Sequence, residues 1–248
     1  MANFTEGLKK LSFYDEDDLV LHEVMTGNGE IAFTMFGMTT EFRVRTLFTK
    51  EPETIRWIET FKPGEVFWDI GANIGCYSLY AAKRNVIVQA FEPSPVNYWL
   101  LAKNVAVNKF EKITTYPFAL SDRTGIFFWE PNVTAGSADN QLLNECKAAC
   151  VQSYNIDELV KYSGVEFPNH IKLDVDGIEK LILEGGRNTL MDSRVRSLMC
   201  EVTEGAPETE YIVDLIKQLG FNEPVTRHAP YYDENHYAPM FNYLFYKT

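Results

Sequence analysis

Apolar and polar residues alternate along the chain in blocks that predict strands and helices in turn. Past residue 64 the blocks predict a strand, a helix, a strand, a helix and a strand, over 66–70, 75–84, 86–91, 95–107 and 112–116. Alternation at this spacing is typical of parallel strands joined by right-handed crossovers, with ligands bound beyond the carboxyl ends of the strands. The sequence therefore predicts an α/β, Rossmann-like, doubly wound fold for residues 61–248.

The first 60 residues show a different pattern. Two apolar runs, 19–24 and 31–36, flank Asn28-Gly29, which predicts a β-hairpin that turns at this dipeptide. Pro52, with acids beside it, then predicts the start of a helix. We interpret residues 1–60 as an N-terminal extension, a hairpin plus a helix, that serves as a lid.

The second half of the chain continues the alternation less regularly. It predicts strands over 126–129 and 197–202, a strand from residue 170, helices ending at 159 and 219, and an aromatic closing strand over 241–246. Residues 131–146 are polar and irregular, and residues 227–237 are rich in Tyr and His. Long irregular segments inside a compact domain are usually functional, so we interpret the first as a substrate-facing flap and the second as part of an acceptor pocket.

The most informative stretch runs from Val66 to Ser78 and reads V-F-W-D-I-G-A-N-I-G-C-Y-S. An apolar strand here leads through a glycine-bearing turn into a helix. Gly71 and Gly75 lack a Cβ, which permits a tight turn and the close approach of a ligand to the main chain. The unpaired N–H groups at the start of the helix point at the same place. The stretch therefore predicts a nucleotide-binding loop.

Asp69, at the end of that strand, indicates which nucleotide. A carboxylate repels the phosphates of a dinucleotide, whereas it matches the ammonium and sulfonium of S-adenosylmethionine in sign. A dinucleotide fingerprint also requires glycine where this chain has Asn73 and Cys76. We therefore expect the loop to bind S-adenosylmethionine through Asp69, Gly71, Asn73 and Gly75.

Two later positions complete the expected cofactor site. Glu92 ends the next strand, 21 residues after Gly71, where an acid binds the ribose hydroxyls of an adenosine cofactor. Ser121 and Asp122 follow the third strand, where a loop is expected to pass the adenine. We assign all three to cofactor binding.

A strand beginning at His170 carries charges where a buried parallel strand is normally apolar. Lys172 and Asp174 are two residues apart and share a face, and Glu201 ends the following strand. A buried lysine requires a partner, so these residues form either a structural salt bridge or a catalytic group. Because they fall at strand ends, we assign Lys172, Asp174 and Glu201 to catalysis, with either the lysine or a carboxylate as the base.

Composition restricts the partners. The 248 residues carry a formal net charge of −12 and no Lys/Arg-rich stripe, which argues against a nucleic-acid substrate and favours a small or neutral acceptor. The four cysteines form no C-x-x-C pair and have no accompanying His cluster, so we expect no metal site. The polar first ten residues and the lack of an apolar run of membrane-spanning length predict a cytoplasmic protein.

Four motifs in this order, D-I-G-A-N-I-G, A-F-E-P, A-L-S-D and I-K-L-D-V-D-G-I-E with a following G-G, resemble the FkbM family of S-adenosylmethionine-dependent methyltransferases. The resemblance spans roughly residues 45–247. It implies a seven-stranded sheet with an antiparallel last strand, and O-methylation of hydroxyls on sugars or secondary metabolites. The family more often has glutamate where this chain has Asp176.

Two other classes of protein compete with this interpretation. A NAD-dependent oxidoreductase would share the fold, but the missing central glycine and the carboxylate of Asp69 argue against it. A catalytically silent cofactor-binding protein would keep the loop without the chemistry, and the acids at 69, 92, 174 and 201 disfavour it. The sequence does not predict the oligomeric state.

Overall fold

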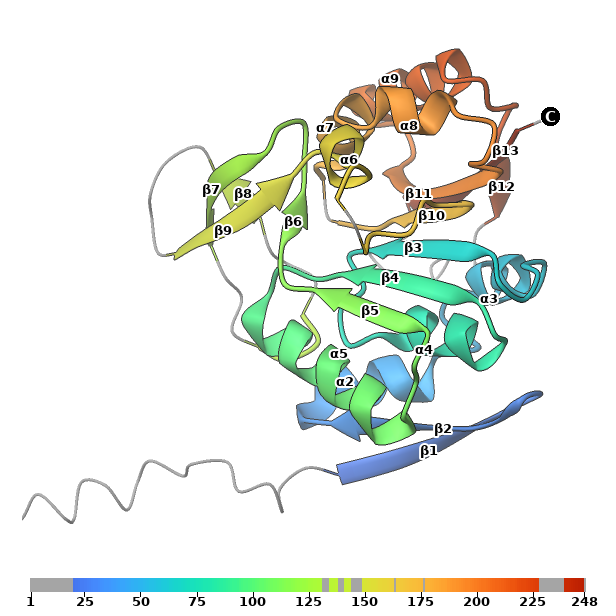
Figure 1. Ribbon diagram of the computed structural model, residues 1–248, viewed down its shortest axis with the longest axis vertical. Coiled ribbons are helices and arrows are strands. Elements are labelled where there is room, and N and C mark those ends of the chain that lie inside the picture. The colour runs from blue at the N-terminus through green and yellow to red at the C-terminus, as the bar shows by residue number, and fades with distance from the viewer. Residues whose placement is uncertain are drawn as a thin grey trace, which may run out of the picture.

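The computed structural model describes residues 20–130, 134–137, 141–143, 149–162, 164–175, 177–227 and 239–247 (Figure 1). The strands are β1 (Val20–Thr26), β2 (Gly29–Met35), β3 (Val66–Ile70), β4 (Ile87–Phe91), β5 (Ile113–Tyr116), β6 (Ala119–Leu120), β7 (Gly125–Glu130), β8 (Gln141–Leu143), β9 (Ala149–Tyr154), β10 (His170–Leu173), β11 (Ser197–Thr203), β12 (Val225–Arg227) and β13 (Met240–Tyr246). The helices are α2 (Gly37–Arg45), α3 (Pro52–Ile58), α4 (Cys76–Lys83), α5 (Pro95–Asn108), α6 (Ile156–Leu159), α7 (Glu179–Glu184), α8 (Arg187–Met191) and α9 (Pro207–Gln218).

The central sheet has seven strands in the order β12-β13-β11-β10-β3-β4-β5. β3, β4, β5, β10 and β11 pair in parallel, and β13 runs antiparallel to both of its neighbours. This arrangement confirms the predicted Rossmann-like fold with an antiparallel last strand. Strand order reverses between β3 and β10, and parallel sheets of this kind bind ligands at such a reversal.

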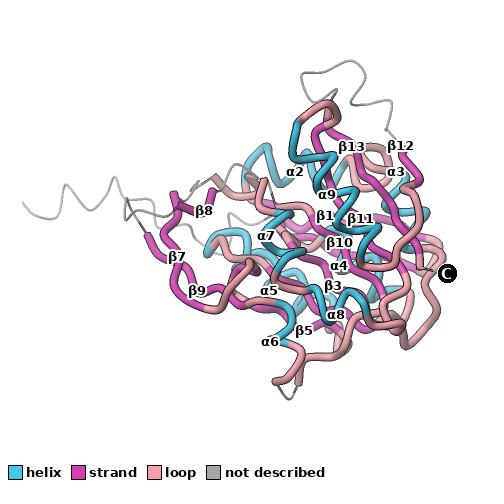
Figure 2. Tube along the Cα trace, turned by 90° about the horizontal axis from the view of Figure 1, so that it is seen from above, coloured by secondary structure: helices cyan, strands magenta, loops and turns pink. Residues whose placement is uncertain are grey.

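Helices cover both faces of the sheet, as expected of a doubly wound fold (Figure 1). On one face α2 to α5 pack with the sheet around one apolar cluster, which includes Trp57, Phe67 and Leu79. On the other, α6 to α9 enclose a second cluster around Trp68, Leu173 and Leu198. Figure 2 shows α7, α8 and α9 crossing over β3, β10 and β11. Because both faces are covered, β3 is buried along its whole length.

The N-terminal hairpin is present, but its turn lies one residue earlier than predicted. β1 pairs with β2 from Val20–Met35 to Thr26–Gly29, which leaves Gly27 and Asn28 as the turn. The Thr26 hydroxyl accepts a hydrogen bond from the Asn28 N–H at 3.1 Å and so fixes the earlier position. The hairpin docks on α5. The side-chain oxygens of Asn108 and Asn104 accept hydrogen bonds from the backbone N–H groups of Ala32 and Thr34 in β2. The division into a lid and a main domain stays a prediction.

Part of the predicted flap is ordered as strand. β6, β9, β7 and β8 form a second sheet, and Gln141–Leu143 pairs with β7, so the prediction that 131–146 is irregular throughout was wrong. Its short strand was missed because the pairing partner supplies the order. α9 begins at Pro207, whereas the apolar spacing predicts a helix only from Tyr211, because the first turn holds the exposed acids Glu208 and Glu210. Among the described residues, no helix has the length and apolar character needed to cross a membrane.

Candidate active site

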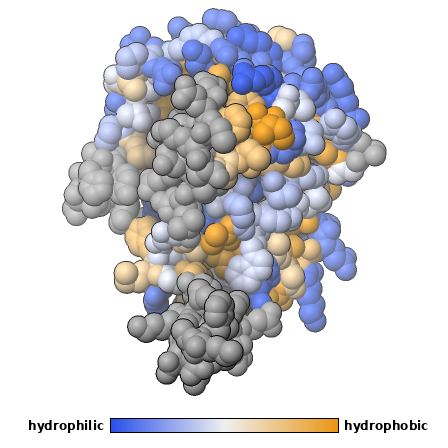
Figure 3. Space-filling view, turned by 90° about the vertical axis from the view of Figure 1, so that its left-hand side faces the viewer, coloured by the Kyte–Doolittle hydropathy of each residue, from blue (hydrophilic) through white to orange (hydrophobic). Residues whose placement is uncertain are grey.

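Except for Ser121 and Asp122, the expected site residues lie at the carboxyl ends of β3, β4, β10 and β11. Register places Lys172 of β10 directly between Asp69 of β3 and Met199 of β11, at the reversal of strand order. Figure 3 views the molecule from this side, where apolar patches alternate with hydrophilic surface.

The loop after β3 has a backbone that only glycine adopts without strain at two positions. Gly71 has a φ of +86°, and a Cβ on it would lie 1.9 Å from the carbonyl oxygen of Asp174. Gly75 has a φ of +89°, and a Cβ there would lie 2.6 Å from Leu101. Left-handed backbone is costly for residues with a Cβ. The loop therefore packs directly on the chain after β10 and brings the two motifs into contact.

Asp69 is 1% exposed, and only one of its two carboxylate oxygens has a hydrogen-bond partner among the described residues. Its Oδ2 accepts a hydrogen bond from the Ser78 hydroxyl at 2.6 Å, while its Oδ1 is buried and has no hydrogen-bond partner among the described residues. Burial raises the pKa of this carboxyl, although Lys172 acts in the opposite direction. A buried acceptor atom without a partner is costly, so Oδ1 is a candidate ligand contact.

Glu92 follows β4 and faces the same loop. One carboxylate oxygen accepts from the N–H of Asn73 at 2.8 Å, and the other accepts from the N–H of Ser94 at 2.7 Å. Burial raises the pKa of Glu92 to about 7, against the effect of these two hydrogen bonds. The carboxyl therefore titrates near neutral pH.

Lys172 is 1% exposed and forms an ion pair with Asp174. Its Nζ also lies 5.1 Å from the centre of the Tyr77 ring, which stabilises a cation. Burial alone lowers the pKa of Lys172, but the neighbouring carboxylates, first Asp174, raise it above its ordinary value overall. Lys172 is therefore an ammonium at neutral pH.

Glu201 lies opposite Asn242 in the β11–β13 pairing, beyond the level of Lys172. Burial raises the pKa of Glu201 well above its usual range, and the charges of Asp174 and Glu51 add to this effect. The structure thus brings Lys172, Asp174 and Glu201 into one electrostatic group. Their catalytic role stays a prediction.

Sequence reasoning missed Glu51, which is 1% exposed and belongs to this group. It precedes α3 and accepts hydrogen bonds from Lys50 at 3.0 Å and Thr54 at 3.2 Å. The cation of Lys50, then that of Lys172, lowers its pKa despite burial. In the sequence Glu51 precedes a proline like any acid at a helix start, so no local signal distinguished it.

Ser121 and Asp122 have other neighbours. The Ser121 N–H donates to the carbonyl of Tyr154 at 3.0 Å, and a Cβ on Gly185 would lie 2.3 Å from the Ser121 carbonyl oxygen. The Ser121 hydroxyl donates to Asp122 at 3.1 Å. These contacts fix the position of the loop after β6. That the loop binds the adenine of the cofactor stays a prediction. Asp176 lies outside the described residues.

Residues 134–137, from the predicted flap, contact the loop after β3. The Asn73 side-chain amide donates to the Ser137 carbonyl at 3.0 Å, and Asn97 of α5 donates to the same oxygen at 3.0 Å. Asn97 also accepts from the Gly136 N–H at 2.7 Å, and Arg43 donates to the Gly136 carbonyl. The described part of the flap is therefore tied to Asn73, one of the expected cofactor residues.

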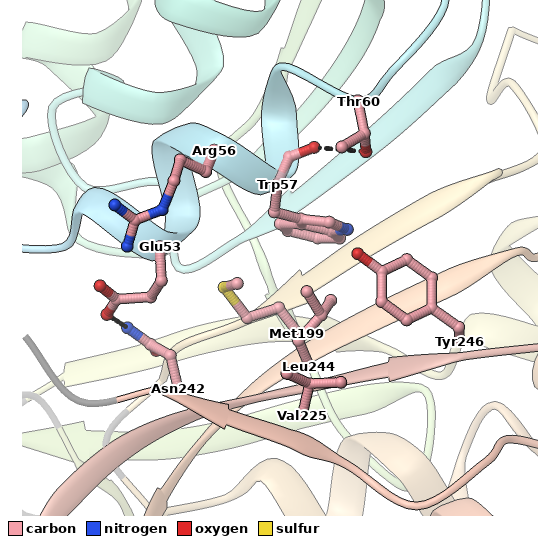
Figure 4. Close-up of a pocket in the computed structure, with 9 residues that line it drawn as sticks. All are labelled: Glu53, Arg56, Trp57, Thr60, Met199, Val225, Asn242, Leu244 and Tyr246. Atoms are coloured by element: carbon pink, nitrogen blue, oxygen red, sulfur yellow. Dashed lines mark hydrogen bonds between the residues drawn. The ribbon is translucent and has the colours of Figure 1, made fainter.

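A cavity of about 260 Å³ lies beside the charged group, between α3 and the strands β11 to β13 (Figure 4). Its lining residues are Glu53, Arg56, Trp57, Thr60, Met199, Val225, Asn242, Leu244 and Tyr246. Within it, the Asn242 amide donates to the buried carboxyl of Glu53 at 3.0 Å. Since Asn242 pairs with Glu201, the cavity is adjacent to the charged group. It combines an apolar wall with a few polar side chains, which is typical of small-molecule sites.

Comparison with known proteins gives a family match. The model of the methyltransferase FkbM domain matches residues 69–223. The hexuronic acid methyltransferase AglP of Haloferax volcanii is 26% identical over 196 residues, which cover 79% of this chain and 79% of AglP. The 31-O-demethyl-FK506 methyltransferase FkbM of Streptomyces tacrolimicus is 25% identical over 217 residues, covering 73% of this chain and 81% of that protein.

Among solved structures, the METTL16 methyltransferase domain superposes with a TM-score of 0.52 at 14% identity, covering 91% of this chain and 86% of that one. At this identity the likeness concerns the fold alone.

Proposed function

The chain belongs to the FkbM family of S-adenosylmethionine-dependent methyltransferases, and from this premise we propose that it methylates a hydroxyl oxygen of a sugar or another small acceptor. The observation that carries the proposal is the charged group of Lys172, Asp174 and Glu201 at the carboxyl ends of β10 and β11. A methyl transfer to oxygen requires a proton acceptor at this place.

The residues around the loop fit the cofactor, S-adenosylmethionine. We propose that Asp69, through its unpartnered Oδ1, faces the positive charges of the methionine part. Gly71, Asn73 and Gly75 present the main chain, Glu92 accepts from the ribose hydroxyls, and Ser121 and Asp122 border the adenine. When bound, S-adenosylmethionine supplies a methyl carbon already activated by the sulfonium. The protein has only to align the acceptor, exclude water and remove a proton.

The proton acceptor is a carboxylate of the group, Asp174 before Glu201, because burial raises the pKa of Glu201 well above its usual range and so favours its protonated form. Lys172 is unsuitable because its neighbours hold it as an ammonium. Its role is to fix Asp174, which lies at the strand end with its side chain 23% exposed and thus accessible to an acceptor. A carboxylate beside a buried cation keeps a defined position, which general-base catalysis requires.

Two relatives and the charge of the chain support the acceptor class. AglP acts on a hexuronic acid and FkbM on 31-O-demethyl-FK506, as their names state, and both relatives span most of this chain. The net charge of −12 also disfavours a polyanionic acceptor such as RNA. The cavity beside Glu201 offers room for part of a small acceptor.

The test is incubation with S-adenosylmethionine labelled at the methyl group and a panel of free and glycan-linked hexoses and hexuronic acids, polyhydroxylated macrolides and an RNA transcript. Mass spectrometry should detect the gain of one methyl group on a carbohydrate or macrolide oxygen. Transfer to RNA alone overturns the acceptor class. Binding of S-adenosylmethionine without transfer to any member of the panel would favour a catalytically silent cofactor-binding protein.

A further inference from the structure

Glu51 is part of the charged group although it comes from the segment before the methyltransferase fold. It is 1% exposed, and the Tyr77 hydroxyl, Lys50 and Thr54 all hydrogen bond to its carboxylate. Tyr77 belongs to α4, directly after the cofactor loop, and its ring also contacts the Lys172 ammonium. The N-terminal segment therefore places a carboxylate at the wall of the cofactor site.

Acidic side chains outnumber basic ones around this wall. Among the described residues, Arg43, Lys50 and Lys172 are the cations that act on the group. The carboxyl groups in the same network are Glu51, Asp69, Glu92, Asp174 and Glu201. Carboxyl groups thus outnumber cations. Burial raises the pKa values of Asp69, Glu92 and Glu201 and so favours their uncharged forms, whereas the cations of Lys50 and Lys172 lower the pKa of Glu51 despite burial and keep its carboxylate charged.

A buried carboxylate that stays charged favours a cationic ligand over a neutral one. S-adenosylmethionine carries a sulfonium, and its product S-adenosylhomocysteine carries an uncharged sulfur in the same place. Otherwise the two molecules present the same groups. The charge at this wall therefore affects the affinity for the donor more than the affinity for the product.

We propose that Glu51 is a specificity-determining residue by which the N-terminal segment makes the site prefer the charged methyl donor over the uncharged product. Lys50, whose side chain is 24% exposed, opposes it by partly neutralising the same carboxylate. The inference rests on the proposed function, since it takes S-adenosylmethionine as the ligand. It assigns to the segment before residue 60 a task in cofactor recognition that is separate from covering the site.

The experiment is titration calorimetry of S-adenosylmethionine and S-adenosylhomocysteine with the unchanged protein, Glu51→Gln, Glu51→Asp and Lys50→Gln. Glu41→Gln is the control, because Glu41 lies in the same segment and forms an exposed i,i+4 pair with Arg45. The measured quantity is the ratio of the Kd of the product to the Kd of the donor. It should fall about three- to tenfold in Glu51→Gln, the size expected when one nearby charge is removed.

The two neighbouring substitutions should act in opposite directions. Lys50→Gln should raise the ratio, whereas Glu51→Asp and Glu41→Gln should leave it within about twofold. A merely structural role of Glu51 would weaken both ligands equally. An unchanged ratio in Glu51→Gln overturns the inference, and so does a ratio that falls in Lys50→Gln. Failure of the unchanged protein to bind either ligand overturns the proposed function itself.

Discussion

Burying the side chain of Lys172 costs free energy unless groups of opposite charge lie beside its ammonium. A lysine removed from water is stable as an ammonium only if carboxylates surround it, and Asp174, Glu51 and Asp69 do so. The same arrangement fixes the position of Asp174 at the strand end. At the residue scale, the site is therefore a set of carboxyl groups arranged around one buried cation.

The first prediction at this scale concerns Asp174 and Lys172. Asp174→Asn and Lys172→Met should each lower the turnover rate about 10²-fold or more, the usual size of a general acid–base contribution. Affinity for S-adenosylhomocysteine, measured by calorimetry, should stay within a few-fold. Asp192→Asn is the control, because Asp192 pairs with Arg194 at the surface. A structural salt bridge would instead lower melting temperature and yield together with activity, and the remaining folded fraction would turn over normally.

The second prediction concerns Glu92, whose pKa is about 7. If its carboxylate binds the ribose hydroxyls, the protonated form must lose its proton first, so cofactor affinity should rise with pH from about 6 to 8. Glu92→Gln should weaken binding by about 1–3 kcal/mol at pH 8 and flatten this part of the pH dependence. Calorimetry across the pH range provides the measurement. An affinity that falls with rising pH would contradict the assignment.

At the scale of elements, the cofactor loop and the segment after β10 depend on each other. The loop turns at Gly71, where the backbone touches the Asp174 carbonyl, and the Asn73 N–H donates to Glu92. A strand end, a loop and a helix start thus fix one another's positions. Small residues in the loop serve this packing as well as ligand approach.

Gly71→Ala tests this dependence, and Gly64→Ala is its matched control. Both glycines have a φ of +86°, but a Cβ on Gly64 meets nothing within 4 Å, whereas on Gly71 it collides with the Asp174 backbone. Gly71→Ala should therefore lose at least about 1 kcal/mol more stability than Gly64→Ala, because backbone must move. It should also weaken cofactor binding more than tenfold. Equal losses in thermal unfolding and calorimetry would show that the close approach is unimportant.

At the scale of the whole molecule, the N-terminal segment is part of the main core. Ile31, Phe33, Trp57 and Ile58 are buried in the same cluster as Phe67, and the Trp57 indole donates to the Ser197 hydroxyl at 2.9 Å. His170 of β10 stacks on Phe61, the residue directly after the segment, at 3.9 Å between ring centroids. The segment therefore covers the sheet face as well as reaching the site through Glu51.

A chain that begins at residue 61 should consequently fail to fold cooperatively. Removal of the segment exposes the apolar side chains that it covers, each worth about 1.5–3 kcal/mol when buried, against a typical total stability of about 5–15 kcal/mol. Circular dichroism during heating should show no sharp transition. A cooperative transition together with binding of S-adenosylhomocysteine would instead support a separable lid, as the sequence alone predicted.

The sequence by itself determined the fold class, the glycine-bearing loop after β3 and the strand-end acids. Hydrophobic periodicity is set locally, and the D-I-G-A-N-I-G motif places glycines and Asp69 within a few residues of one another. The strands from β3 to β5 were predicted to within a residue or two for the same reason. Lys172 stood out because a charge in a buried strand violates the local pattern.

Tertiary structure decided which charges meet. Glu51 has no local signal, and it joins Lys172 only because α3 folds back over the sheet face. β8 was missed because its order comes from pairing with β7. The protonation of Lys172 and Glu201 likewise follows from burial beside groups distant in sequence. Coulomb interactions and desolvation depend on distances through space, and these distances are fixed only when the strands and helices have packed.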